Sequence, residues 1–246
     1  MAGNGASGNG QLAGEARIWA VAGLIADEHR AQLLLAMLSG QPQTGSALAD
    51  AAGISRSLAS AHLKKLVAGG LVQVQAQGRQ RLYSIASTLV ADMLEMLILL
   101  APPAEVRSLR QDTRARSLRW ARLCYDHLAG AVGVAVTDAL LGRGLLASKD
   151  GAYLLTPDSA SAFAGFGIDV GELGRGTRPL LRPCLDWSER RHHLAGGLGA
   201  ALTGELLRRR WLRGQEASRI VTVTPAGQAG LRDWLGLDLT ALRTAA

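Results

Sequence analysis

Residues 45–84 contain the pattern that most restricts the fold of this chain. A short amphipathic segment ends at Gly53, a second helical segment runs from Ser55 to Gly70, and two alternating segments follow around Gly78. Serine is typical of helix starts, glycine of helix ends, and alternation of strands. The pattern predicts helix, turn, helix and β-hairpin, the layout of a winged helix-turn-helix domain whose second helix enters the major groove of DNA.

The charge of this segment favours the same interpretation. No acidic residue lies between Asp50 and Asp92, whereas lysine and arginine recur along the second helix and the hairpin. Such cations neutralise phosphates, and phosphate contacts position a protein before it reads bases. The alternative is a solvated surface helix with a charged hairpin. The residues that we predict to bind DNA are Ser55, Arg56, Ser57, Ser60, His62, Lys64, Lys65, Arg79 and Arg81.

These residues are expected to act in three ways. A serine at position 55 or 57 caps the helix and leaves its amide end to face a phosphate. Lysines on the helix hold phosphate, and arginines on the hairpin reach phosphate or the minor groove. The expected major-groove readers are Arg56, Ser57, Ser60 and His62.

Several short runs carry a resemblance to a known family. They are Leu48-Ala49, the run Ser60-Ala61-His62-Leu63-Lys64-Lys65-Leu66, and residues 78–84 of the hairpin. Together they resemble the ArsR/SmtB family of bacterial repressors over roughly residues 18–100. The resemblance implies a homodimer on a palindromic operator in double-stranded DNA, released by an inducer. Many metal-sensing members carry a Cys-x-Cys motif before the turn, whereas residues 43–47 here contain neither cysteine nor histidine.

Residues 88–100 are apolar on almost every side of a predicted helix. A helix of this kind must be buried. Together with residues 18–25, it is predicted to form the dimer interface. The alternative is burial within the chain, beneath its C-terminal half.

Composition sets limits on the class of protein. The chain has 246 residues, a net charge of +7 and two cysteines, and no apolar run approaches the ~20 residues of a membrane helix. The first residues lack the pattern of a signal peptide and read as a disordered tail. We therefore expect a cytoplasmic protein with no membrane partner. The positive charge suits a polyanion.

An internal repeat occupies the C-terminal half. His127-Leu128-Ala129-Gly130 aligns without a gap with His193-Leu194-Ala195-Gly196, an offset of 66 residues, and the similarity continues to a Thr-Pro pair in each copy. Each copy predicts helix, helix, hairpin and helix. The hairpins are expected to turn at Lys149-Asp150-Gly151 and near Gln215-Glu216-Ala217.

The chain is therefore predicted to be mainly α-helical with small antiparallel β-wings. The predicted parts are a tail (1–14), a winged-helix DNA-binding and dimerisation domain (15–101), a linker helix (102–120) and a C-terminal sensor domain (121–240). The sensor domain would contain repeats at about 121–170 and 184–238 and is not expected to read DNA. Candidates for the lining of a small-molecule pocket there are Trp120, Tyr125, Phe163, Phe166 and Trp187.

The candidate effector residues are Cys124, His127, Cys184 and His193. Cys124 and His127 lie three apart on a probable helix and would share a face. If the repeats pack together, the four residues suit a soft metal or metalloid ion. A reversible thiol switch and inert core cysteines are the alternatives. Under the offset of 66 residues Cys124 aligns with Arg190, so the cysteines would not be equivalent.

Catalysis is the class that the sequence disfavours. Cys124, His127 and Asp186 form a set that a thiol nucleophile would need. However, no phosphate-binding loop, nucleophile elbow or dinucleotide fingerprint is present. The expected function is a homodimeric DNA-binding transcriptional repressor, released by a metal or small-molecule effector, and not an enzyme.

Overall fold

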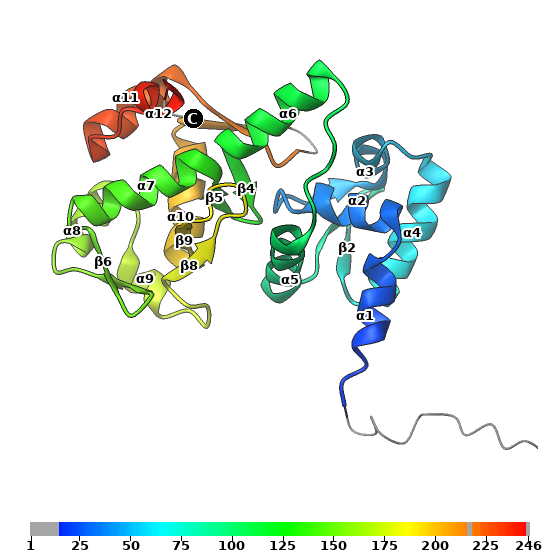
Figure 1. Ribbon diagram of the computed structural model, residues 1–246. Helices are drawn as coiled ribbons and strands as arrows, with labels where there is room; N and C mark the ends of the chain where they lie inside the picture. The colour runs from blue at the N-terminus through cyan, green and yellow to red at the C-terminus, as the bar shows by residue number, and fades with distance from the viewer. Residues whose placement is uncertain (1–14, 216–217, 245–246) are drawn as a thin grey trace, which may run out of the picture.

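The computed structural model describes residues 15–215 and 218–244, and the N-terminal part of the chain is a small unit of helices with one sheet (Figure 1). Its elements are α1 (Ile18–Ile25), α2 (Glu28–Met37), β1 (Gln43–Thr44), α3 (Gly45–Ala52), α4 (Arg56–Ala68), β2 (Val72–Gln77), β3 (Gln80–Ile85) and α5 (Thr88–Leu100). The strands pair antiparallel in the order β1-β3-β2. The predicted winged helix-turn-helix layout is confirmed. The predicted tail, residues 1–14, lies outside the described residues.

Local chemistry explains the turn between α3 and α4. Gly53 ends α3 in the left-handed conformation with φ at 66°, which glycine adopts without a steric clash. The Ser55 hydroxyl then accepts a hydrogen bond from the Leu58 N–H at 3.3 Å and caps α4. Beneath the turn, α2, α3 and α4 share a buried core that includes Leu33, Leu34, Leu48, Leu63 and Leu66.

The apolar helix α5 is covered on one side only. Ala91 and Leu94 are buried, whereas Leu89, Met96 and Leu100 are 76%, 55% and 77% exposed. Burial beneath the C-terminal half, the alternative to a dimer interface, therefore accounts for only part of this helix.

The C-terminal half contains two similar units around one core. The first comprises α6 (Leu109–Trp120), β4 (Arg122–Cys124), β5 (His127–Ala129), α7 (Gly130–Gly142), β6 (Leu146–Lys149), β7 (Ala152–Leu155), α8 (Ser159–Gly165) and α9 (Val170–Gly174). The second comprises β8 (Arg182–Leu185), β9 (His192–Ala195), α10 (Gly196–Arg208), β10 (Leu212–Gly214), β11 (Val221–Val223), α11 (Pro225–Leu235) and α12 (Leu239–Thr244). The helix α6 lies within the predicted linker and packs on α7.

The two units exchange equivalent hydrogen bonds. The Leu128 N–H donates to Thr203 Oγ1 at 2.8 Å, and the Leu194 N–H donates to Thr137 Oγ1 at 2.9 Å. The second strand of each leading hairpin is thereby tied to the long helix of the other unit. This reciprocal packing places β5 beside β9 at the centre of the C-terminal half.

The predicted secondary structure at the start of each repeat is wrong. His127 and His193 lie on strands, and each repeat begins with a β-hairpin where a helix was expected. The strands are only three or four residues long. Runs this short contain too little alternation to be separated from a helix by pattern.

The alignment of the cysteines is also wrong. Cys124 pairs with His127 across the first hairpin, and Cys184 pairs with His193 across the second. The cysteines are therefore equivalent, although they lie 60 residues apart and the histidines 66. The difference is an insertion of six residues in the second hairpin turn, which a gapless alignment hides.

One predicted hairpin turn is confirmed. Asp150 and Gly151 connect β6 and β7 with φ angles of 50° and 77°, and two successive positive φ angles are typical of a two-residue hairpin turn. In the other turn, residues 216 and 217 lie outside the described residues.

Two of the aromatic residues expected to line a pocket belong to the core, whereas Trp120 and Trp187 each border a hollow. Phe163 and Phe166 are 0% and 4% exposed, and Phe166 stacks on Trp234 with 3.8 Å between ring centroids. They therefore stabilise the C-terminal half and are not available to line a ligand pocket.

Polar contacts join the two halves of the chain. Arg182 of β8 forms two hydrogen bonds with Asp92 of α5, each 2.8 Å long. Arg219 forms an ion pair with Glu95, also on α5. The Tyr125 N–H donates to the Leu38 carbonyl at 3.0 Å. Across the described part of the chain, no helix has both the length and the apolar character needed to cross a membrane.

Candidate DNA-binding face and Cys/His cluster

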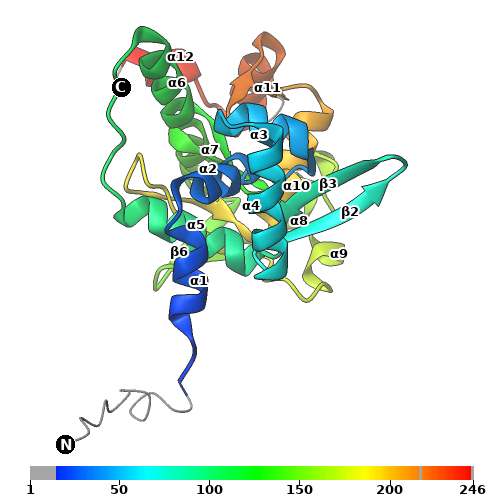
Figure 2. The ribbon, with the colours of Figure 1, turned by 90° about the vertical axis from the view of Figure 1, so that its right-hand side faces the viewer.

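The exposed side of α4 carries most of the residues predicted to bind DNA. Figure 2 shows the β2–β3 hairpin projecting beside this helix. The predicted residues that are exposed on the two elements are Ser55, Arg56, Ser57, Ser60, Lys64, Lys65, Arg79 and Arg81. Cationic side chains on a helix and an adjacent hairpin are the arrangement that a winged domain presents to a duplex.

A hollow separates the start of α4 from the wing. Its volume is about 290 Å³, and Arg56, Ser60 and Arg81 are among its lining residues. An arginine from the helix and one from the wing thus face the same space. A phosphate or a base edge in this hollow would meet both guanidinium groups.

The prediction for His62 is wrong. This residue is only 8% exposed, because it lies on the side of α4 that packs against α2. Its Nδ1 is 3.7 Å from Asp27 Oδ1, and its ring centroid is 5.7 Å from that of His29. A side chain held there cannot reach a base edge, so His62 belongs to the packing of the domain.

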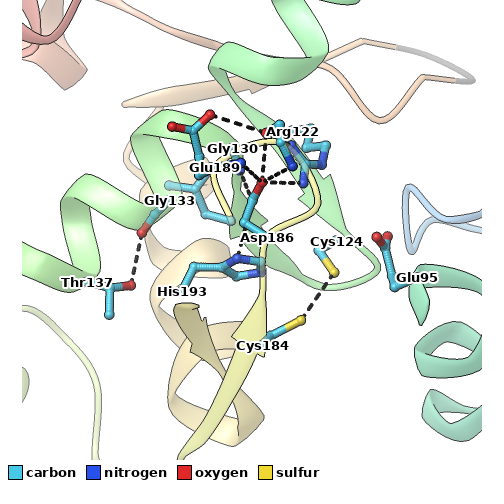
Figure 3. Close-up of polar contacts among 12 residues, drawn as sticks. Glu95, Arg122, Cys124, Gly130, Gly133, Thr137, Cys184, Asp186, Glu189 and His193 are labelled. Carbon is cyan, nitrogen blue, oxygen red and sulfur yellow. Dashed lines mark hydrogen bonds and ion pairs between the residues drawn. The ribbon is translucent and has the colours of Figure 1, made fainter. Parts of the chain in front are cut away.

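The four predicted effector residues lie together in the C-terminal half. One ligand atom from each of Cys124, His127, Cys184 and His193 falls within 4.8 Å of the others. The two Sγ atoms are 3.8 Å apart, and the two imidazole centroids are 5.1 Å apart. Figure 3 shows the cysteines of the two hairpins pointing toward each other, with His193 beside them. Cys184 is half-buried and the other three are buried.

An aspartate holds the imidazole of His127. The Asp126 Oδ1 lies 3.1 Å from His127 Nδ1, and Arg178 donates two hydrogen bonds to the same carboxylate. Burial would raise the pKa of Asp126, but its bonds to His127 and Arg178 lower it to about 2. The carboxylate therefore stays charged and fixes the orientation of the ring.

Asp186 has the same role beside His193. Its Oδ2 lies 3.3 Å from His193 Nδ1 and accepts the Gly130 N–H at 2.7 Å, while Arg122 contacts Oδ1 at 2.9 Å (Figure 3). Burial would raise the pKa of Asp186, but the contact with His193 and the positive charge of Arg122 hold it far below its usual value. Both histidines thus face a carboxylate with Nδ1.

The protonation of the cluster follows from these contacts. The hydrogen bond to Cys184, together with burial, raises the pKa of the Cys124 thiol to about 12. Burial would lower the pKa of His127, but Cys124 and Asp126 outweigh it and raise the pKa. Burial would also lower the pKa of His193, but its contact with Asp186, together with Cys124, outweighs burial and raises the pKa. Cys124 is therefore a protonated thiol at neutral pH and not a free thiolate.

Known proteins similar to this chain are transcriptional regulators, and one of them overlaps 89% of its length. The family model of a helix-turn-helix domain matches residues 25–75. The chain is also 35% identical over 219 residues to an uncharacterized HTH-type transcriptional regulator, YdfF, of Bacillus subtilis (strain 168), an overlap of 89% of this chain and 97% of that protein. The chain belongs to the ArsR/SmtB family of transcriptional regulators.

Solved structures similar to this regulator match about a third of its length. The homodimeric winged helix-turn-helix domain of Mb0332 from Mycobacterium bovis is 30% identical, covers 34% of this chain and 76% of that chain, and has a TM-score of 0.32. The cadmium metal-sensor CMTR from Mycobacterium tuberculosis is 32% identical, covers 37% and 96%, and has a TM-score of 0.30.

Sequence reasoning about this regulator named Asp186 but missed Asp126 and Arg178, which also border the cluster. Asp126 precedes His127 directly, but only the hairpin turn brings its carboxylate back to the ring. Arg178 lies 52 positions from Asp126 and gave no local signal. A search for charged residues next to each candidate ligand would have found Asp126 and left Arg178 undetected.

Proposed function

We propose that this regulator is a homodimeric repressor that binds a palindromic operator through α4 and the wing and leaves it when an effector binds the C-terminal half. The observation that carries the proposal is the exposed cationic face of α4 and the wing, in which Arg56 and Arg81 border one hollow. A target on chromosomal DNA would place the protein in the cytoplasm.

The exposed apolar residues support the dimer. Ile18 and Trp19 of α1 are 75% and 51% exposed, and α5 exposes Met96 and Leu100. A second copy would cover both helices and remove this surface from water. Because two copies related by symmetry present two α4 helices, the expected operator is palindromic.

We also propose that the Cys/His/Asp set has no catalytic role. A thiol nucleophile requires a lowered pKa, and the pKa of Cys124 is raised to about 12. Asp186 is occupied by Arg122, Gly130 and Ser188, so it is placed to support the hairpins rather than to activate a nucleophile at Cys124.

The test is binding of the reduced, tag-free protein to its gene's own upstream DNA, followed by fluorescence anisotropy against a scrambled duplex. The proposal predicts a preference of about 10³-fold or more, with two chains per operator by light scattering. Equal affinity for the two duplexes at several salt concentrations would overturn the repressor and favour non-specific binding.

A further inference from the structure

We propose that Cys124, His127, Cys184 and His193 bind one divalent, thiophilic metal ion of the zinc class in tetrahedral coordination, and that this ion is the effector of the C-terminal half. The metal site stands on the structure alone. Its role as effector rests on the function proposed above.

The spacing of the sulfurs fits such an ion. A zinc–thiolate bond is about 2.3 Å long, so two thiolates at the tetrahedral angle lie about 3.8 Å apart. The Sγ atoms of Cys124 and Cys184 are 3.8 Å apart, and all four ligand atoms lie within 4.8 Å of one another. Small side-chain movements would therefore complete the coordination.

The histidines present nitrogens that have no other partner. Among the described residues, the Nε2 atoms of His127 and His193 are buried and make no hydrogen bond. The His127 Nδ1 is held by Asp126 at 3.1 Å, whereas the His193 Nδ1 lies 3.3 Å from Asp186 without a hydrogen bond, and both rings leave Nε2 for an ion. A buried polar atom without a partner raises the free energy of the folded state, and an ion would remove this cost.

The charge balance favours a divalent ion. On binding, each thiol would lose its proton to water, and each imidazole that carries a second proton would lose it from Nε2, so that two metal–sulfur and two metal–nitrogen bonds replace these S–H and N–H bonds. Two thiolates and two neutral imidazoles then neutralise a dication. A monovalent ion would leave one uncompensated negative charge among residues that are mostly buried, which is costly. Asp126 and Asp186 are already balanced by Arg178 and Arg122.

The same residues fit a disulfide switch less well. A disulfide would need an external oxidant and no imidazole, whereas two carboxylate-bound imidazoles accompany the thiols here. The metal site is also accessible, because Cys184 is only half-buried and an ion could reach it from solvent.

An ion bound here would act on α5 through both hairpins. Arg219 donates from Nε to the Leu123 carbonyl at 3.0 Å, beside Cys124, and pairs with Glu95 of α5. Arg182, two positions before Cys184, pairs with Asp92 of the same helix. Fixing the hairpins therefore fixes two contacts to the helix expected at the dimer interface. The position of that helix would set the spacing of the two α4 helices.

The first test measures metal binding without DNA. Reduced, tag-free protein is titrated with Co²⁺, and the Zn²⁺ affinity is measured by competition with a chromophoric chelator. The expected result is one ion per chain with a sulfur-to-cobalt charge-transfer band and tetrahedral visible bands. Cys184→Ser and His193→Ala should each weaken binding about 100-fold or more, whereas the adjacent exposed His192→Ala should bind as the wild type.

Circular dichroism decides whether each variant is folded. If folded wild-type protein takes up no stoichiometric Co²⁺ or Zn²⁺, the metal site is overturned, and a disulfide formed with peroxide would then identify a thiol switch. If Zn²⁺ binds but leaves operator affinity unchanged, the effector role is overturned. Metal uptake by a protein that shows no operator preference would overturn the proposed repressor and leave the metal site supported.

Discussion

Arg182 and Asp92 form a pair of 2.8 Å hydrogen bonds that joins the strand carrying Cys184 to the apolar helix α5. The residues are 90 positions apart, so the contact links elements of the two halves. The Arg219–Glu95 pair lies one helical turn further along α5. The proposed effector site is therefore connected to the DNA-binding part by two ion pairs on one helix.

We predict that Arg182→Ala uncouples the two halves without preventing metal binding. An effector usually changes the affinity at a coupled site by about 5–150-fold. Loss of the Arg182–Asp92 contact, one of the two links to α5, should remove most of the effect of Zn²⁺ on operator affinity. Operator affinity is measured with and without Zn²⁺. Arg191→Ala is the matched control, because its ion pair with Asp138 lies within the C-terminal half. Equal Zn²⁺ responses of Arg182→Ala and wild type would contradict the coupling route.

Substitutions on α4 should separate base reading from phosphate binding. Arg56→Ala is expected to cost about 1–3 kcal/mol in operator affinity and to reduce the preference over scrambled DNA. Lys65→Ala should weaken binding to both duplexes roughly equally and lower the salt slope by about one. Lys149→Ala, on the exposed β6 strand of the other half, controls for loss of charge. An unchanged operator preference in Arg56→Ala would show that this arginine does not enter the groove.

The apolar face of α5 should be required for the dimer. Met96→Glu places a charge on a side chain that is 55% exposed in the single chain. We expect it to shift the mass measured by light scattering toward the monomer, because a buried unpaired charge disfavours association. Leu154→Glu, at a leucine of β7 that is 45% exposed, should leave the mass unchanged. A Met96→Glu dimer as stable as the wild type would place the interface elsewhere.

Substitution by alanine is expected to have different effects on stability at two glycines of α10. A Cβ at Gly199 would lie 2.5 Å from the Leu194 carbonyl oxygen, so Gly199→Ala should destabilise the protein by about 1–3 kcal/mol. Nothing lies within 4 Å of a Cβ at the exposed Gly204, and Gly204→Ala should be neutral or stabilising by up to about 1 kcal/mol. Thermal denaturation measures both. A neutral Gly199→Ala would mean that β9 and α10 are not packed as closely as described.

The DNA-binding part was predictable because its signals are local. Gly53 and Ser55 mark adjacent helix ends, and the cations of α4 and the wing lie within one short segment. His62 is the exception. Its sequence neighbours are Ala61 and Leu63, and they do not reveal which side of α4 the ring occupies. The side chain is directed toward α2, and this depends on tertiary packing.

The effector cluster was predictable in its residue types and not in its geometry. Cys124 and His127 were expected to share a helix face, and they are opposite residues of a hairpin. Spacing of three residues fits both arrangements. The six-residue insertion between Cys184 and His193 concealed that the two hairpins present equivalent pairs. Only the folded chain shows that the four ligand atoms meet.

The metal-released repressor is tested most directly by the anisotropy of a labelled duplex from the gene's own upstream region, titrated with the reduced protein in the presence and absence of Zn²⁺. We expect tight, sequence-selective binding that Zn²⁺ weakens about tenfold or more in the wild type and in His192→Ala, and not in His193→Ala. Binding that is equally tight to a scrambled duplex, or that responds to Zn²⁺ identically in His193→Ala, would contradict it.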